Sequence, residues 1–318
     1  MRLLIVGCGY VGKALAEHFL RYSLSKNGSS PSENSRSPLA NNELSICALT
    51  RSEANANVLR SCGINAHVGH WLDRSSLPEL EQSFTHLLVA VPHRADSGCN
   101  LDESSDQFHV QGLINLRDWL SGGRFDIAKP NNDLPKLVYL STTGVYGQTG
   151  AGETVNECTP VEPNRVGPRI AVAAERWLLT NSDEWPSTVL RLAGIYGPGR
   201  IPLLEKLRSN EPLAVPSVGR LNLIHLDDIV AAIIWALRSP SAESLYVLSD
   251  RAPVLRQEFY SYLAKLHGLA LPQFVEPAAD DNRLKRSSDK IVDSTKFWKQ
   301  SGLTPIHPDY TSGLAKSG

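Results

Sequence analysis

The sequence lacks the features that would direct it to a nucleic acid, into a membrane or through a secretory route. Its 318 residues include 32 basic and 33 acidic side chains, and the net charge of -1 gives no general attraction to polyanions or anionic lipid. No apolar run is long enough to span a bilayer. The chain opens directly on an apolar stretch of strand length, which leaves no room for a cleaved targeting peptide. We therefore expect a cytoplasmic protein without nucleic-acid or membrane partners.

Cysteines are few, and their arrangement excludes two further classes of protein. The chain has 5 cysteines, an odd number, and no two of them have the C-x-x-C spacing. We expect reduced thiols rather than a disulfide framework or a set of zinc ligands. The 9 histidines show no spacing typical of metal ligands, so no metal site is expected. The cysteines are Cys8, Cys47, Cys62, Cys99 and Cys158.

Near its start the chain has a glycine motif between a strand-like and a helix-like segment. Residues 3–6 form an apolar run of strand length, and G-x-G-x-x-G follows at once. Such a motif makes a tight turn, lets the backbone approach a pyrophosphate, and packs the next helix closely on the strand. The helix N-terminus then presents N–H groups and the positive end of its dipole to the phosphates. We predict a dinucleotide-binding turn formed by Gly7, Gly9, Tyr10, Val11 and Gly12.

Strand-like and helix-like segments alternate along the first two thirds of the chain. This alternation predicts an α/β fold with a doubly wound parallel sheet of the Rossmann type. The expected strands are residues 3–6, 45–49, 65–68, 86–91, 136–141 and 187–192. The expected helices after the first are residues 53–62, 77–83, 108–120 and 168–179.

The rest of the chain suggests a second lobe and an insertion. After residue 196 the alternation weakens, with helices expected at 201–207, 226–238 and 255–267 and a strand at 245–248. We expect an NAD(P)-binding domain over residues 1–195 and a small substrate-binding lobe over residues 196–318. Residues 22–43 are rich in Ser, Asn and Pro, so we expect a flexible insertion there.

The residues after the second strand bear on the choice between NAD and NADP. An acidic side chain there accepts from the ribose 2′-hydroxyl of NAD, whereas arginine accommodates the 2′-phosphate of NADP. The chain has Arg51 and Ser52 at this place and no acid before Glu53. NADP is therefore the expected cofactor, and NAD is left open. Because ligands of open parallel sheets bind at the carboxyl ends of strands, we also expect the cofactor near Ala90, Val91 and Ser141.

Four segments, in order, carry a resemblance to a known family. They are residues 7–12, with the glycine motif, 140–147 (Leu-Ser-Thr-Thr-Gly-Val-Tyr-Gly), 191–199 (Arg-Leu-Ala-Gly-Ile-Tyr-Gly-Pro-Gly) and 224–230 (Ile-His-Leu-Asp-Asp-Ile-Val). Together they resemble the extended short-chain dehydrogenase/reductases, the NAD-dependent epimerase/dehydratase family. The tail over residues 297–314 is similar to the end of that family, so the resemblance spans nearly the whole chain. The wording Gly-Cys-Gly-Tyr-Val-Gly further resembles an atypical subgroup.

The resemblance implies a catalytic Tyr-x-x-x-Lys pair on a helix, and the chain departs from it there. The i, i+4 spacing puts both groups on one helix face, where the ammonium lowers the pKa of the tyrosine. Glu175 matches the glutamate that follows the pair in the family. That alignment puts Gly167 at the tyrosine position and Ala171 at the lysine position. Neither side chain can transfer a proton.

Two residues remain as candidates for catalysis. Thr142 matches the Ser/Thr that the family places on the strand before the Val-Tyr-Gly turn. Its hydroxyl could orient a substrate oxygen or simply close the turn, and both interpretations stay open. Tyr146 could donate a proton, although the resemblance makes it a turn residue beside the cofactor.

Arginines provide the candidates for substrate binding. Arg165 and Arg169 flank the vacant tyrosine position, and Arg200 and Arg220 lie in segments where the resemblance places the substrate. A guanidinium stays protonated near neutral pH, so these side chains would bind an anionic group rather than act as bases. A solvated surface role for each stays open. His225 is interpreted as a structural residue that caps the following helix. The substrate-binding candidates are Arg169, Arg200 and Arg220.

Two functional hypotheses follow from these residues. The first is an NADP(H)-binding oxidoreductase or epimerase-like enzyme that acts on an unknown small molecule. The second is a non-catalytic NADP(H)-sensing or interaction protein that kept the dinucleotide site and lost the acid. A homodimer is left open.

Overall fold

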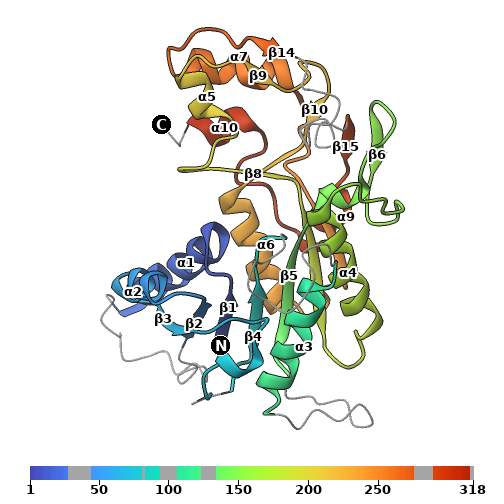
Figure 1. The fold of residues 1–318 in the computed structure, drawn as a ribbon. Coiled ribbons are helices and arrows are strands. Elements are labelled where there is room, and N and C mark those ends of the chain that lie inside the picture. Colours follow the sequence, from blue (N-terminus) through green and yellow to red (C-terminus); the bar gives the residue numbers. More distant parts are fainter. Residues whose placement is uncertain (28–43, 81–82, 94–105, 123–133, 276–288, 316–318) are drawn as a thin grey trace, which may run out of the picture. The chain divides into compact units, whose positions relative to one another are not determined.

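The largest feature of the fold is a seven-stranded sheet. A computed structural model describes residues 1–27, 44–80, 83–93, 106–122, 134–275 and 289–315. The strand order is β12-β7-β5-β4-β1-β2-β3, and the run from β3 to β7 has the order of a Rossmann-type doubly wound sheet (Figure 1). The strands are β1 (Arg2–Val6), β2 (Ser45–Thr50), β3 (Asn65–Val68), β4 (His86–Val89), β5 (Lys136–Thr142), β7 (Ser187–Leu192) and β12 (Leu245–Leu248).

The register of the central strands places the glycine motif at the ligand-binding edge. β1 pairs in parallel with β2 and β4, so that Val6 lies beside Leu49 and Val89. Leu4 and Leu88 are fully buried in this part of the sheet. Strands covered on both faces have such continuous apolar runs, as expected from the sequence. The carboxyl ends of β1, β2 and β4 therefore meet at one edge.

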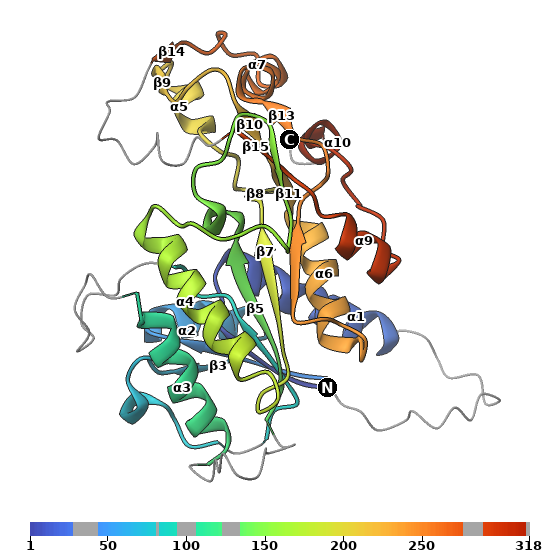
Figure 2. The same cartoon turned by 90° about the vertical axis from the view of Figure 1, so that its right-hand side faces the viewer.

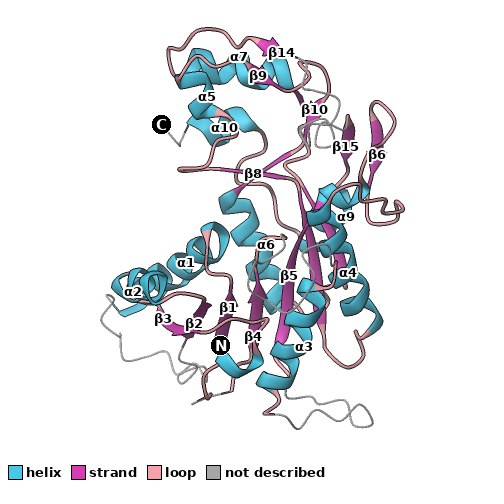
Figure 3. Ribbon diagram, in the orientation of Figure 1, coloured by secondary structure: helices cyan, strands magenta, loops and turns pink. Residues whose placement is uncertain are grey.

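Helices alternate with the sheet strands along the chain (Figure 3). Ser52 caps α2, because its hydroxyl accepts a hydrogen bond from the N–H of Asn55 at 3.3 Å. In the described part of the chain, no helix has the length and apolarity that crossing a bilayer requires. The helices that alternate with strands are α1 (Tyr10–Asn27), α2 (Glu53–Ser61), α3 (Phe108–Leu120), α4 (Val166–Thr180) and α6 (Leu226–Arg238).

The chain forms two compact units, each built from several stretches. Unit 1 consists of Met1–Leu140, Ala173–Thr188 and Ala236–Ser244. Unit 2 consists of Ser141–Val172, Val189–Trp235 and Leu245–Gly318. The expected domains over residues 1–195 and 196–318 stay a prediction.

The described residues of unit 2 contain four small two-stranded sheets and several short helices. An aromatic cluster that includes Tyr196, Phe259 and Tyr260 forms one of its cores. Leu207 of α5 belongs to this cluster, and Phe274 of β14 packs against it. Both views show β9, β14, α5 and α7 side by side (Figures 1 and 2). The paired strands are β6 (Glu153–Val155) with β15 (Lys290–Val292), β8 (Gly194–Tyr196) with β11 (Leu223–His225), β9 (Leu213–Ala214) with β14 (Phe274–Val275), and β10 (Arg220–Leu221) with β13 (Val254–Leu255). The remaining helices are α5 (Leu204–Arg208), α7 (Arg256–Leu266), α9 (Thr295–Ser301) and α10 (Tyr310–Ala315).

Three expectations about local structure are wrong in part. Residues 22–27 continue α1 instead of starting the insertion, because the first strong helix breaker is Gly28; residues 28–43 lie outside the described part. No helix starts at Leu77, because the residue before Pro78 is driven to extended backbone, and a short 3₁₀ turn, η1 (Arg74–Ser76), precedes it. The helix expected over 201–207 begins only after Leu203, which has a φ of 56°.

Candidate dinucleotide and substrate sites

The three glycines of the motif differ in what surrounds them. Gly7 has a φ of +85°, and a Cβ there would lie 2.8 Å from backbone atoms of Ala90 and Val91. A Cβ on Gly12 would lie 2.9 Å from Cγ2 of Ile5 on β1. Around Gly9 nothing lies within 4 Å. The geometry expected for each glycine is confirmed: a tight turn, an open face, and close contact of helix with strand.

The turn fits the diphosphate of a dinucleotide. The N–H of Gly9 donates to the carbonyl of Gly7 at 2.7 Å, which closes the turn, and α1 begins at the next residue, Tyr10. The first N–H groups of a helix have no intrahelical acceptor, so they can donate to phosphate oxygens beside the open face of Gly9. Val11, in the first turn of α1, is buried. Cys8, between Gly7 and Gly9, is also buried, and its own burial raises the pKa of its thiol to about 12. That thiol is therefore unreactive at neutral pH.

Ala90 and Val91 lie directly against the glycine turn. The N–H of Ala90 donates to the carbonyl of Val6 at 2.8 Å, which extends the pairing of β4 with β1 by one residue. The backbone of both residues then stands where a side chain on Gly7 would be. The structure thus brings these two predicted cofactor residues together with Gly7.

Arg51 and Ser52 follow β2 at the same edge of the sheet as Gly7. Arg51 is exposed. The hydroxyl of Ser52 caps α2, so it has a structural role whether or not a cofactor is bound. The first acid after β2, Glu53, forms an ion pair with Arg60 of the same helix. The carboxylate that could accept a hydrogen bond from a ribose 2′-hydroxyl, that of Glu53, is thus bound to Arg60.

Thr142 ends β5 and begins the turn of unit 2 that carries Tyr146. Its hydroxyl accepts a hydrogen bond from the N–H of Gly144 at 3.1 Å and caps the 3₁₀ turn η2 (Thr143–Tyr146). The structural role considered for Thr142 is therefore confirmed, and its hydroxyl proton remains able to donate. A Cβ on Gly144 would lie 3.3 Å from the Thr142 hydroxyl and 2.9 Å from Nη2 of Arg165. Ser141, the residue before Thr142, is buried.

Tyr146 is buried, with its hydroxyl in two hydrogen bonds. It donates to the carbonyl of Asn156 at 2.7 Å and accepts from Nη1 of Arg191 at 3.0 Å. The guanidinium of Arg191 also lies over the ring, 5.2 Å from its centre. These contacts hold the turn in place, and a catalytic role for Tyr146 stays a prediction.

The three arginines predicted to bind substrate have different local environments. Arg169 is half-buried on α4. Arg200 is exposed, and its backbone forms a β-bridge with Gly197. Nη1 of Arg220 contacts both carboxylate oxygens of Asp289, at 2.9 and 3.0 Å. Burial acts to raise the pKa of Asp289, but the hydrogen bonds from Arg220 hold it below the usual value.

Sequence reasoning missed two buried cations of unit 2. Lys290 on β15 is 8% exposed, and its Nζ donates to the carbonyl of Gly147 at 3.5 Å. Arg256 at the start of α7 is 4% exposed, and its Nη1 donates to the carbonyl of Val218 at 2.8 Å. Neither belongs to a local motif, so only long-range contacts reveal them.

Unit 1 also buries a polar cluster that the sequence did not reveal. The hydroxyl of Tyr139 lies 2.8 Å from Nδ1 of His109 and 3.1 Å from Nε2 of His93. Nε2 of His109 donates to the carbonyl of Pro92 at 3.2 Å, so its Nδ1 accepts the phenol proton. Burial lowers the pKa of both imidazoles, that of His93 to about 4. Both rings are therefore neutral at pH 7.

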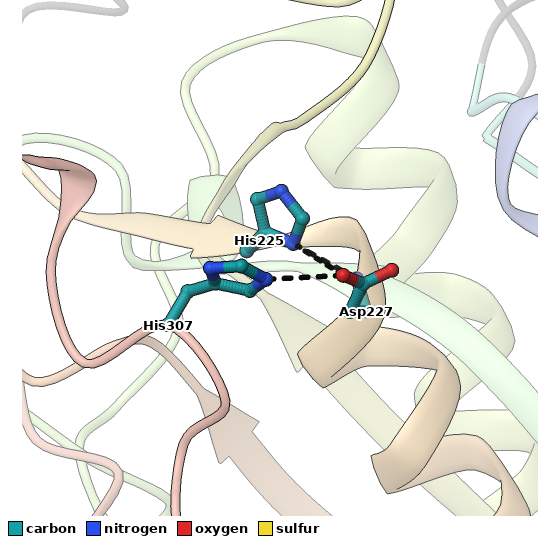
Figure 4. Close-up of side chains that lie close together, drawn as sticks. All are labelled: His225, Asp227 and His307. Carbon is teal, nitrogen blue, oxygen red and sulfur yellow. Dashed lines mark hydrogen bonds and ion pairs between the residues drawn. The ribbon is translucent and has the colours of Figure 1, made fainter. Parts of the chain in front are cut away.

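Among the described residues, one group of His, Cys, Asp or Glu side chains is close enough together to hold a metal ion. It consists of His225, Asp227 and His307 (Figure 4). The N–H of Asp227 donates to Nδ1 of His225 at 3.1 Å, which confirms His225 as a cap of α6. Nε2 of His307 lies 3.0 Å from the Asp227 carboxylate, and the two imidazole centres are 3.7 Å apart. The helix cap uses Nδ1 of His225, the ring nitrogen nearest the Asp227 carboxylate. We therefore interpret the three residues as a clasp that joins α6 to the segment before α10. The expected absence of a metal stays a prediction.

Asp228 completes this clasp between α6 and the segment before α10. Its two carboxylate oxygens accept from the N–H groups of Ile306 and His307, at 2.6 and 3.2 Å. Burial raises the pKa of Asp228, and these two hydrogen bonds act against the rise. The clasp therefore has a structural function, which is to join α6 to the segment before α10.

The glycine turn at the edge of a parallel sheet in this strand order defines a Rossmann-type dinucleotide-binding protein. The sequence profile of the NAD dependent epimerase/dehydratase family matches residues 3–248, and the chain belongs to this family. The resemblance drawn from the four sequence segments is thereby confirmed.

Similar proteins agree with this assignment. Protein YeeZ of Escherichia coli (strain K12) is 32% identical over 223 residues, which make up 70% of this chain and 72% of that protein. A solved structure of a functionally unknown conserved protein from Silicibacter pomeroyi has a TM-score of 0.72 and 26% identity, and the match covers 99% of this chain and 97% of the other. The dTDP-glucose 4,6-dehydratase of Bacillus anthracis, solved with NAD, has a TM-score of 0.74 at 17% identity, over 100% of this chain and 95% of the other. At that identity the likeness concerns the fold alone.

Proposed function

We propose that this protein is an NADP(H)-dependent oxidoreductase whose glycine turn holds the cofactor and whose unit 2 binds an anionic small molecule. The open face at Gly9 beside the first turn of α1 carries the cofactor part of the proposal. Bound NADPH would supply a hydride to a substrate carbonyl and become NADP⁺, and a proton from water would complete the alcohol. Thr142 would orient the carbonyl oxygen with its hydroxyl proton. A cytoplasmic location and a homodimer remain predictions.

Selectivity for NADP over NAD rests on Arg51. It follows β2 at the edge where the ribose of a dinucleotide lies in this fold. A guanidinium meets a 2′-phosphate with charge-assisted hydrogen bonds. Glu53, the nearest acid along the chain, pairs with Arg60, which favours this interpretation.

Replacing Arg51 should separate the two cofactors. In Arg51→Ala the affinity for NADPH should fall about ten- to a hundredfold, because a charged hydrogen-bonded contact contributes about 1.5–3 kcal/mol. NADH has no 2′-phosphate, so its affinity should barely change. Calorimetric titration of both proteins with both cofactors measures this, and Arg74→Ala, at an exposed position of η1, is the matched loss of an arginine. Equal wild-type affinities for NADH and NADPH would reopen NAD as the cofactor.

The residues at the position of the family's catalytic pair favour the second hypothesis, a non-catalytic NADP(H) sensor. In the alignment anchored at Glu175, the catalytic pair is replaced by Gly167 and Ala171. Ala171 is fully buried in an apolar cluster with Val145 and Val172. No titratable group can therefore act from that position.

Turnover separates the two hypotheses. If the protein is an oxidoreductase, NADPH should be consumed with at least one carbonyl compound from a panel that includes keto acids and phosphorylated aldehydes and ketones. Interconversion of UDP-glucose and UDP-galactose should be lower by about 10²–10⁴-fold or more than with an intact acid–base pair. Tight NADPH binding with no consumption across the panel would support the sensor and contradict the oxidoreductase.

A further inference from the structure

Arg220, one of the predicted substrate-binding residues, is held by a single carboxylate. Nη1 of Arg220 donates to both carboxylate oxygens of Asp289, at 2.9 and 3.0 Å. The backbone N–H of Arg220 donates to Oδ1 of the same side chain at 2.9 Å. A Cβ on Gly152 would lie 3.5 Å from Nη1 of Arg220. One nitrogen of the guanidinium therefore lies against Asp289 and close to Gly152.

The backbone on both sides of this ion pair is fixed by hydrogen bonds within unit 2. The carbonyl of Asp289 accepts from the N–H of Gly152 at 2.7 Å, directly before β15 pairs with β6. The side chain of Asn222 donates to the carbonyl of Lys290 at 2.9 Å and accepts from the N–H of Val292 at 2.8 Å. The two segments that carry the ion pair therefore cannot shift past each other without breaking these bonds.

The other edge of the Arg220 guanidinium can take a ligand. Among the described residues, neither Nε nor Nη2 of Arg220 takes part in a hydrogen bond or an ion pair. These two nitrogens carry three N–H groups, and two of them point in parallel from one edge, which matches the two oxygens of a carboxylate. The side chain of Arg220 is 34% exposed, so solvent and a small ligand can reach it.

The charge of Asp289 determines which oxyanion this edge favours. Burial acts to raise the pKa of Asp289, but the hydrogen bonds from Arg220 keep it below its ordinary value, so the carboxylate is ionised at neutral pH. It offsets the charge of Arg220 and repels a second anion, and this repulsion is about twice as large for a dianion as for a monoanion. A dianion also costs more to remove from water. The paired guanidinium therefore favours a monoanion.

We propose that the Nε–Nη2 edge of Arg220 anchors a carboxylate of the substrate, and that Asp289 selects a carboxylate over a phosphate at this place. Asp289 is a positioning residue that acts through Arg220, because it occupies Nη1 and leaves only the opposite edge to the ligand. The assignment of the carboxylate to the substrate rests on the proposed function, whereas binding of a simple anion to Arg220 requires neither cofactor nor turnover.

The test follows the Nε–H signal of Arg220 by NMR at pH 6, while the cofactor-free protein is titrated with acetate or with sulfate. The signal is identified by its absence in Arg220→Lys, so binding at the glycine turn of unit 1 is not mistaken for binding here. In the wild type, acetate should shift this signal and bind at least as tightly as sulfate. In Asp289→Asn, affinity should rise about three- to tenfold for acetate and about ten- to a hundredfold for sulfate, because the lost repulsion counts twice for a dianion.

Asp289→Asn should fold, because an amide oxygen can still accept from the N–H of Arg220. Asp293→Asn is the matched control: it removes the same charge from the same segment, and Oδ1 of Asp293 also accepts a backbone N–H, that of Thr295 at 2.9 Å. Four residues of extended chain separate the two aspartates, which exceeds the Debye length of about 8–10 Å. Both affinities should therefore stay as in the wild type.

An Arg220 signal that neither anion shifts would overturn the proposal. So would an equal gain for the two anions in Asp289→Asn, or tighter binding of sulfate than of acetate by the wild type, a comparison that depends on no variant. If the anion results hold and no carbonyl compound is reduced, the proposed function fails and the selectivity of Arg220 stands. If reduction occurs, keto acids should have a lower KM than phosphorylated aldehydes and ketones, and Asp289→Asn should narrow this difference.

Discussion

Gly9→Ala is expected to remain folded and to lose about ten- to a hundredfold in affinity for NADPH. A Cβ at this position meets no atom of the protein within 4 Å, and Gly9 is not among the glycines with positive φ. Gly9 precedes the first residue of α1, so the change also replaces a glycine N-cap by a poorer one, at a cost of at most about 1 kcal/mol. The added methyl group would occupy the space that a pyrophosphate needs, and overpacking costs about 1–3 kcal/mol.

Gly7→Ala, unlike Gly9→Ala, should lower the stability of the fold itself. Its Cβ would lie 2.8 Å from the backbone of Ala90 and Val91 at a φ of +85°, so the free energy of unfolding should fall by about 1–3 kcal/mol even without cofactor. Urea unfolding of the apoproteins and calorimetry with NADPH measure the two quantities. Gly150→Ala, at a loop glycine with ordinary φ, is the control. If Gly9→Ala bound NADPH as tightly as the wild type, the open face would not be the pyrophosphate site.

The sequence was sufficient for six of the seven strands of the sheet and for the glycine turn, because their signals are local. The strand at 245–248 was expected in the second lobe, but as β12 it pairs with β7 in the sheet. A buried parallel strand is a short apolar run, and each glycine of the motif has a distinct steric requirement within a few residues. The expectation of a helix from Leu77 was wrong for an equally local reason, since Pro78 excludes helical backbone at Leu77.

The burial of Lys290 and the clasp were not predictable from the sequence, because both depend on long-range contacts. Lys290 meets Gly147, a residue 143 positions earlier, and Asp228 binds backbone groups 78 and 79 positions later. Nothing in the neighbourhood of Lys290 distinguishes it from a surface lysine. The role of His225 was predictable because a helix cap requires only the residues beside it.

The polar cluster around Tyr139 should make the protein sensitive to acid. His93 is half-buried overall, but its ring is enclosed by His109 and Tyr139, and its folded-state pKa is about 4 against 6.5 for the unfolded chain. Between these values the unfolded state binds a proton that the folded state does not. Stability is therefore complete above pH 6.5 and falls as the pH decreases, by about 3 kcal/mol at pH 4 from His93 alone. His109, whose pKa is also lowered by burial, adds to the loss.

The wild-type curve alone does not isolate this effect, because Asp250 acts in the opposite sense. Burial raises the pKa of Asp250 to about 8, so between pH 4 and 8 the folded state binds a proton there that the unfolded state lacks, and stability rises as the pH decreases. The informative quantity is thus the difference between the wild type and His93→Gln, which keeps a polar side chain near Tyr139 and cannot titrate. Urea unfolding at pH 7 and pH 4.5 should show a smaller acid loss in His93→Gln, by about 2–3 kcal/mol. His18→Gln, at an exposed position of α1, should follow the wild type. An equal acid loss in His93→Gln and the wild type would mean that folding does not lower the pKa of His93.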